Sequence, residues 1–155
     1  MKEKQVYAKN KKALHRYKIL EKFEAGIKLE GHEVKSIRAG QASLKGTYVT
    51  FHKGDAYMTN LTIPKYKYSQ DILDYDPERK RKLLLKQKEI DYLSSKSKEK
   101  GLTIVPLALY NSGRYVKVQI AVAKGKKKKD KRAELKQKQQ EREANRMAKK
   151  MSTEY

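Results

Sequence analysis

Apolar and polar residues alternate along several short stretches of this chain, which is the pattern of strands with one buried face. The longest stretch covers residues 17–29, where apolar side chains fall on odd positions and only Leu20 and Glu21 break the alternation. Gly26 marks where so long a strand could bend or bulge, as strands do at the corners of barrels. Shorter strands are expected at residues 44–51, 56–63, 83–85, 102–110 and 115–124.

Two short helices are predicted between these strands. Residues 33–39 and 87–100 each carry apolar side chains on one face, and Gly40 and Gly101 are placed to end them. Glycine-containing turns join two pairs of strands, and no internal repeat is present. We therefore expect a mainly β fold with short helices: a six-stranded barrel of the oligonucleotide-binding (OB) type with flanking α-helices.

The alternation stops at Ala123, and a run of lysines follows. Residues 1–124 are predicted to form one RNA-binding β-barrel domain, with a polar, flexible N-terminal leader over residues 1–14. Residues 125–155 offer too few apolar side chains to offset the entropy lost on ordering, so we expect a basic tail that is disordered when free. A merely solubilising tail and binding to a membrane surface are the alternatives, and folding upon RNA is preferred.

Charge adds a partner to this picture. The 155 residues include 39 lysines and arginines against 18 acidic residues, a net charge of +21, and the excess lies in both parts of the chain. Such a surplus favours polyanions, so RNA or DNA is the expected partner and affinity should fall with salt. Strand parity points Lys18, Lys22, Lys28 and Lys117 away from the apolar face, together with Glu24, as a footprint for nucleic acid.

A long segment without periodicity, residues 65–81, is expected to be either functional or disordered. It carries Tyr66, Tyr68 and Tyr75, which together with Tyr110 are candidates for stacking on unpaired bases. Plain exposure to solvent is the alternative for each of these side chains.

Other kinds of chemistry find little support. There is no cysteine, no glycine-rich phosphate loop and no glycine-flanked serine, so we do not expect an enzyme. His15, His32 and His52 lack the spacing of metal ligands, and no metal or cofactor is predicted. No apolar stretch approaches the roughly 20 residues of a membrane span, which indicates a cytoplasmic protein without a membrane partner.

Recognisable motifs run in order along nearly the whole chain: Asn10-Lys11-Lys12-Ala13, Glu24-Ala25-Gly26-Ile27 and the segments 31–40, 76–85, 101–107, 123–127 and 130–132. From Asn10 to about Met147, this series resembles the SsrA-binding protein family, also called small protein B. The resemblance implies a six-stranded OB barrel. It also implies that the partner is transfer-messenger RNA (tmRNA, or SsrA), which the protein would deliver to stalled ribosomes for trans-translation and ribosome rescue.

The resemblance assigns roles to residues by position. The body would grip the tRNA-like domain of tmRNA through Asn10, His15, Glu24, Leu84 and Lys117. The tail would occupy the empty mRNA channel and the decoding centre of the small ribosomal subunit as a helix. Its contacts would be made by Lys124, Lys126, Lys127, Asp130, Lys131, Arg132, Lys136, Lys138, Arg142 and Arg146. We expect a monomer, and the alternative is a ribosomal or ribosome-assembly RNA-binding protein, which would share a basic barrel and arm.

Overall fold

The chain divides into two units, Met1–Gly125 and Lys126–Tyr155. The computed structural model describes residues 5–69, 72–126, 136, 138–140 and 142–146. The elements of the first unit are β1 (Val6–Lys9), α1 (Lys11–Arg16), β2 (Tyr17–Ile27), α2 (Gly31–Arg38), β3 (Tyr48–His52), β4 (Asp55–Thr59), β5 (Arg81–Leu84), α3 (Gln87–Ser97), β6 (Leu102–Ser112) and β7 (Tyr115–Gly125).

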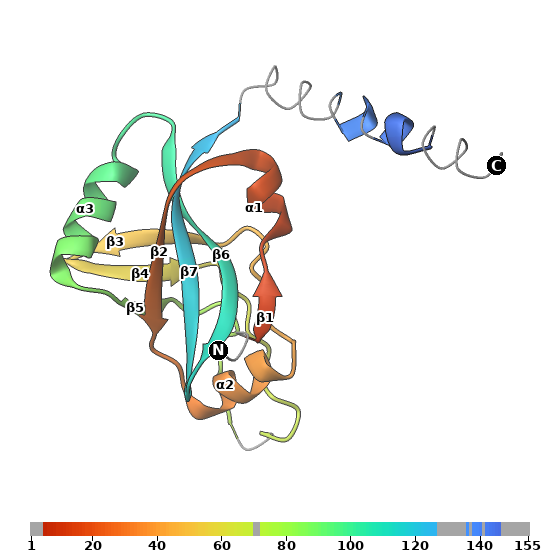
Figure 1. Ribbon diagram of the computed structural model, residues 1–155. Helices are drawn as coiled ribbons and strands as arrows, with labels where there is room; N and C mark the ends of the chain where they lie inside the picture. The colour runs from red at the N-terminus through yellow and green to blue at the C-terminus, as the bar shows by residue number, and fades with distance from the viewer. Residues whose placement is uncertain (1–4, 70–71, 127–135, 137, 141, 147–155) are drawn as a thin grey trace. The chain divides into compact units, whose positions relative to one another are not determined.

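All strand pairs are antiparallel, and they form one sheet in the order β1-β6-β7-β2-β5-β4-β3. Strands β2, β6 and β7 run alongside one another, while the β3–β4 hairpin crosses their direction (Figure 1). Strand β2 links the β6–β7 side of the sheet to the strands β5, β4 and β3, because it pairs with β7 as far as Gly26 and with β5 at Gly26 and Ile27. The mainly β prediction is confirmed. Within the described residues β1 and β3 end the sheet without pairing to each other, so the structure does not confirm a closed OB barrel.

Strand β1 and helix α1 lie within and just beyond the predicted leader, where no element was expected, and the flexibility of the leader stays a prediction. Strand β1 adds a seventh strand to the six predicted, and it pairs with β6. Backbone hydrogen bonds from Asn10 N to Leu107 O and from Asn111 N to Gln5 O, both 2.8 Å, hold its two ends. The local pattern concealed this strand because it is only four residues long, and its partner lies far along the chain.

An extra residue in β2 explains where the alternation breaks. Ile19 lies opposite Ala123 and Glu21 opposite Val122, so Leu20 forms a β-bulge and is 46% exposed. Gly26, where a bend or bulge was predicted, is the residue at which β2 passes from β7 to β5, and the bulge lies at Leu20.

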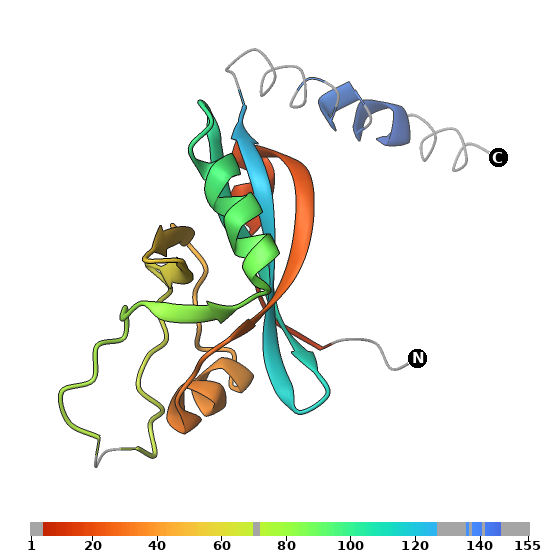
Figure 2. The same cartoon turned by 90° about the vertical axis from the view of Figure 1, so that its left-hand side faces the viewer.

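Two apolar clusters lie on opposite faces of β6 and β7. The larger cluster packs Ile37 of α2 and Leu93 of α3 against strand residues such as Ile120, and α3 lies beside β6 and β7 (Figure 2). The smaller cluster places Ala13 of α1 with four strand residues, Val105, Leu107, Ala121 and Ala123. Around Val105 and Ala121, β6 and β7 are therefore buried on both faces, and α1 covers a face of β7 that its alternation predicted to be polar.

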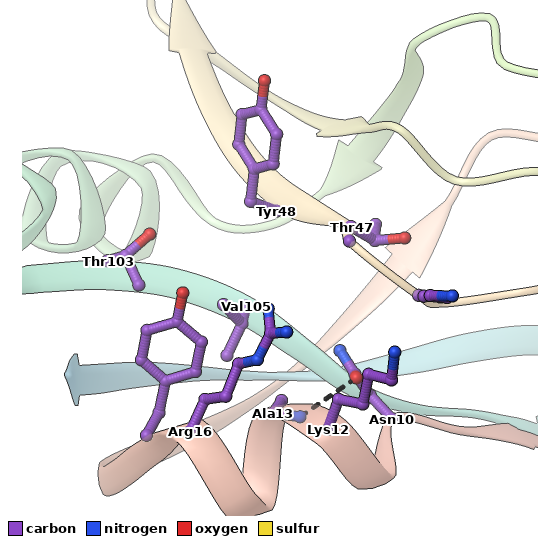
Figure 3. Close-up of a pocket in the computed structure, with 11 residues that line it drawn as sticks. Asn10, Lys12, Ala13, Arg16, Thr47, Tyr48, Thr103 and Val105 are labelled. Carbon is purple, nitrogen blue, oxygen red and sulfur yellow. Dashed lines mark hydrogen bonds between the residues drawn. The ribbon is translucent and has the colours of Figure 1, made fainter. Parts of the chain in front are cut away.

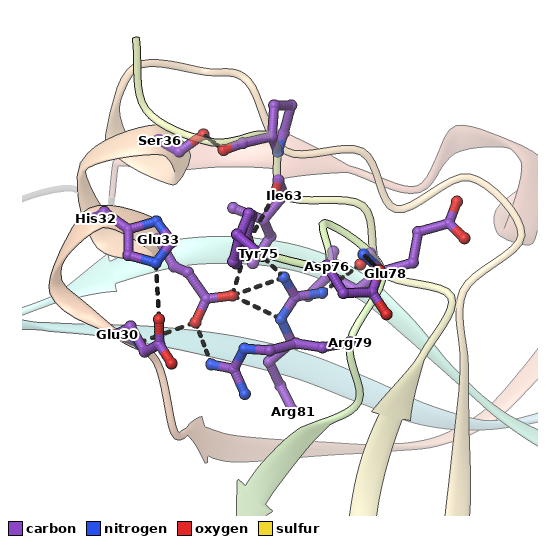
Figure 4. Close-up of polar contacts among 12 residues, drawn as sticks. Glu30, His32, Glu33, Ser36, Ile63, Tyr75, Asp76, Glu78, Arg79 and Arg81 are labelled. Carbon is purple, nitrogen blue, oxygen red and sulfur yellow. Dashed lines mark hydrogen bonds and ion pairs between the residues drawn. The ribbon is translucent and has the colours of Figure 1, made fainter. Parts of the chain in front are cut away.

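A buried ionic cluster joins α2 to the segment between β4 and β5 (Figure 4). Glu33 of α2 and Arg81 of β5 are fully buried, and Nε and Nη2 of Arg81 donate to Glu33 Oε2 at 2.9 and 2.6 Å. Tyr75 donates to the same oxygen at 2.9 Å, and Arg79 pairs with Oε1. These four residues, the Glu33 cluster, hold part of a segment that the sequence predicted to be functional or disordered.

Electrostatics keep the Glu33 carboxylate ionised. Burial raises the pKa of Glu33, but hydrogen bonds from the Glu30 amide, Arg79 and Arg81 outweigh it, so the pKa of Glu33 lies below its ordinary value. For Tyr75, burial and the hydrogen bond to Glu33 raise the pKa to about 12.

The second unit is described in part. Residues 136, 138–140 and 142–146 are helical, and their side chains are exposed. The predicted disorder of the free tail stays a prediction. Among the helices that the structure describes, none is long and apolar enough to cross a membrane.

Candidate nucleic-acid interface

Asn10 stands between β1 and α1, and both ends of its side-chain amide are engaged. Its Oδ1 accepts from the backbone amide of Ala13 at 3.2 Å as the N-cap of α1, and its Nδ2 donates to the carbonyl of Pro106 at 2.9 Å. The residue is 6% exposed. Its amide is thus committed to fixing α1 against β6.

Helix α1 presents His15 to solvent together with cationic neighbours. His15, Lys11, Lys12 and Arg16 are all exposed, while Ala13 between them is buried against the sheet. An exposed imidazole among cations suits a phosphate or an unpaired base. Within the described part of the chain, no group of three His, Asp or Glu side chains is placed to hold a metal.

Glu24 and Lys117 form an ion pair across β2 and β7. Lys117 Nζ lies 3.0 Å from Glu24 Oε1, and the Tyr110 hydroxyl of β6 donates to Glu24 Oε2. Tyr110 lies directly opposite Lys117 in the sheet and is 6% exposed. Burial, followed by the hydrogen bond to Glu24, raises the pKa of Tyr110, so the phenol stays a donor at neutral pH. The carboxylate is consequently held in a fixed orientation at the surface.

Leu84 lies beside this ion pair because β5 joins β2 at Gly26. Leu84 is opposite Gly26 in the ladder and is 56% exposed. A groove lined by Glu24, Leu84 and Lys117, with Lys82 and Lys86 nearby in the lining, runs along this edge, and we call it the Glu24 groove. This combination suits a nucleotide. An apolar side chain can pack on the base, fixed acceptors can bind its polar edge, and cations can bind the phosphate.

The structure therefore brings together three of the five body residues predicted to grip RNA, namely Glu24, Leu84 and Lys117. Asn10 lines a different cavity, next to α1, which shares no lining residue with the Glu24 groove. His15 lies on α1 as well. The five residues thus fall on two sites of the first unit.

The predicted ribosome-contacting residues are described only in part. Lys124 is the last residue but one of β7 and is exposed, and Lys126 lies directly after the strand. Four tail residues are helical and exposed: Lys136, Lys138, Arg142 and Arg146. Four others lie outside the described residues: Lys127, Asp130, Lys131 and Arg132.

Comparison with known proteins decides the family. The family model described as "SmpB protein" matches residues 7–150. The chain belongs to the SmpB family. An SsrA-binding protein of Sulfurihydrogenibium sp. (strain YO3AOP1) is 53% identical over 115 residues, which are 74% of this chain and 75% of that protein. An SsrA-binding protein of Microcystis aeruginosa is 47% identical over 111 residues, 72% of each chain.

A solved structure described as "tmRNA-SmpB: a journey to the center of the bacterial ribosome" also resembles this SmpB family member. Its chain is 46% identical, and the two superpose with a TM-score of 0.66 over 77% of this chain and 84% of that chain. The family membership and the mainly β fold are therefore established together.

Sequence reasoning missed the partner that orients Glu24 in this SmpB family member. Tyr110 is predicted as a candidate for base stacking, but its hydroxyl holds the carboxylate and its ring is buried. A tyrosine near the end of a strand whose side chain faces a charged neighbour could have indicated this role. Tyr75 likewise joins the Glu33 cluster instead of standing free for a base.

Proposed function

We propose that this chain binds transfer-messenger RNA and delivers it to stalled ribosomes, and so acts in trans-translation and ribosome rescue as an RNA-binding protein rather than an enzyme. Membership of the SmpB family carries the proposal, because relatives that are 47% and 53% identical are named SsrA-binding proteins. The similar solved structure, described as tmRNA-SmpB in the bacterial ribosome, supports both partners. We place this activity in the cytoplasm and expect the protein to act as a monomer.

The body would grip the tRNA-like domain of tmRNA at the two sites that hold the five predicted residues. In the Glu24 groove, Lys117 would pair with a phosphate, and Leu84 would pack on a ribose or base. Glu24 would accept from the amino group of an unpaired base, because Tyr110 already fixes its second oxygen. His15 would reach RNA from α1, and Asn10 would act by holding that helix in place.

The tail would take the second step. We infer that residues 125–155 enter the vacant mRNA channel and the decoding centre, where they form a helix against rRNA. Their cationic side chains, which are exposed at Lys136, Lys138, Arg142 and Arg146, supply the charge for this contact. Disorder of the free tail and closure of the OB barrel belong to the same proposal. The folded body would bind tmRNA, and the tail would become ordered only on the ribosome.

Two variants separate these steps. A chain that ends at Gly125 should keep its affinity for isolated tmRNA in a gel shift but should fail to tag peptides in a reconstituted translation system with stalled ribosomes. Glu24→Gln/Lys117→Gln should do the reverse and weaken tmRNA capture, although its net charge is unchanged. The matched control is Lys96→Gln/Glu99→Gln, which removes another surface ion pair, 3.4 Å apart, without touching the groove.

The control should bind tmRNA like the wild type. If the truncated chain loses both RNA binding and tagging, the division of work is wrong. If the wild-type chain copurifies with ribosomes at fixed stoichiometry, stalled or not, and carries no tmRNA, it is a ribosomal or assembly protein instead.

A further inference from the structure

A second cavity lies between α1 and the segment that leads into β3. We call it the α1 cavity, and its volume is about 380 Å³, within the range of small-ligand sites. Lys12 and Arg16 extend from α1 toward the segment that carries Thr47 and Tyr48 (Figure 3). Lys45 of that segment lines the same cavity.

The cations of this cavity face one another without an acidic partner. Among the described residues that line it, none is aspartate or glutamate, and no ion pair to a carboxylate is found there for Lys12, Arg16 or Lys45. Lys12 and Lys45 line the cavity together, and their positive charges interact. The interaction with Lys45, followed by slight desolvation of this exposed side chain and by the charge of Arg16, lowers the pKa of Lys12.

The backbone beneath these cations is fixed. Asn10 caps α1 and ties it to Pro106 of β6, and the Thr47 hydroxyl donates to the carbonyl of Asn60 at 3.2 Å. Two cations held together on rigid supports repel each other, and an anion placed between them removes that repulsion. A phosphate oxygen is the acceptor that matches several N–H donors at once.

Tyr48 adds a second kind of contact at the same cavity. Its side chain is large and apolar yet 40% exposed, at the start of β3. An exposed tyrosine beside phosphate-binding cations is the arrangement by which proteins hold unpaired nucleotides, because every base has a face on which such a ring can stack. An acidic peptide would meet the same cations but would leave the ring unused.

We propose that the α1 cavity binds one nucleotide of an unpaired RNA segment, with the phosphate held by Lys12, Lys45 and Arg16 and the base stacked on Tyr48. The inference rests on the proposed function, since it takes the polyanion to be RNA, and it deepens that function by naming the residues at the α1 site that would contact RNA. Lys45 and Tyr48 are far from α1 in the sequence, so no local motif marks this site.

The test uses the full chain, an unpaired RNA hexamer labelled with a fluorophore, and intact tmRNA. Tyr48→Leu should weaken hexamer binding by about 5- to 100-fold, the worth of one stacked base, while Tyr48→Phe should keep it. Lys12→Gln/Lys45→Gln should lower the slope of log affinity against log salt by about one. Lys35→Gln/Lys88→Gln removes the same charge from two exposed lysines outside the cavity and should lower the slope less. Circular dichroism verifies that each variant is folded.

The outcomes separate the two proposals. If the wild-type chain does not bind tmRNA, the proposed function fails. If it binds tmRNA but folded Tyr48→Leu binds hexamer as tightly as Tyr48→Phe does, the nucleotide site alone is overturned. Tight binding of polyglutamate that depends on Lys12 and Lys45 but not on Tyr48 would overturn it as well.

Discussion

Substituting Glu33 by glutamine should lower the free energy of unfolding by about 3–5 kcal/mol, because it leaves a buried guanidinium without its counter-charge. The side chains of Glu33 and Arg81 are both 0% exposed, so water cannot replace the lost partner. The carboxylate accepts two hydrogen bonds from Arg81, one from Tyr75 and one from the Glu30 amide, at 2.6 to 2.9 Å. A glutamine can accept at only one of its two terminal atoms, and its NH₂ group would face donors.

Urea unfolding followed by circular dichroism measures the change. Glu99→Gln is the matched control, since Glu99 is exposed and its ion pair with Lys96 should contribute less than about 1 kcal/mol. Glu33→Met/Arg81→Met removes both charges together and should cost less than Glu33→Gln alone. A loss below about 1 kcal/mol for Glu33→Gln would refute the reasoning, because it would mean that Arg81 finds water or another partner.

The same cluster predicts a loss of stability in acid. The pKa of Glu33 is lower in the folded state than in the unfolded chain, so its contribution is present above the ordinary carboxyl range and is lost as the pH falls through the folded pKa. The unfolding free energy of the wild type should therefore fall more steeply below about pH 4 than that of Glu33→Gln. If the unfolding free energies of the two proteins fall equally steeply with pH, the pKa of Glu33 is not lowered by folding.

Three further changes test other parts of the structure. Tyr75→Phe should flatten the loss of stability at alkaline pH, because the pKa of Tyr75 is raised to about 12 in the folded state. Its contribution to the unfolding free energy is complete below about pH 10 and is lost as the pH rises through 12. Urea unfolding at pH 9 to 12 measures this loss, and identical profiles for the two proteins would contradict it. Gly26→Val should lower the free energy of unfolding by about 1–3 kcal/mol in the same assay, since the new Cβ would lie 3.1 Å from the Cβ of Leu84. A gain in stability would show that strand propensity outweighs the crowding. Lys117→Met should change the free energy of unfolding by less than about 1 kcal/mol, because the ion pair of Lys117 with Glu24 is partly exposed. The same substitution should lower the slope of log affinity for tmRNA against log salt by about one. Loss of the fold would refute this prediction.

Local patterns were sufficient for most elements of the fold. Residues 115–124 alternate cleanly, and β7 spans Tyr115–Gly125. The strands predicted at 44–51 and 56–63 are shorter, at Tyr48–His52 and Asp55–Thr59, although Leu44, Leu61 and Ile63 are buried as the pattern requires. Alternation reports burial, and a loop can bury an apolar side chain without joining a ladder.

The candidate site was predictable only in its parts. Parity correctly placed Glu24 and Lys117 on the outward face of their strands, since side-chain direction follows from a single strand. Parity could not show that the Tyr110 hydroxyl reaches the same carboxylate from a third strand. That contact depends on the register between β6, β7 and β2, which no local stretch of residues contains.

The order of hydrophobic and charged residues by itself determined a mainly β body, a lysine-rich extension and a preference for a polyanion, because each depends on neighbours in the chain or on total charge. Only the tertiary structure decided that Glu33 meets Arg81, that Lys45 and Lys12 line one cavity, and that Leu84 flanks an ion pair. Strand register and the packing of helices on the sheet set these contacts, because they bring residues that are far apart in the sequence into one buried or confined site. The strength of a charge in this protein therefore depends on its surroundings in the fold, and its sequence alone does not reveal them.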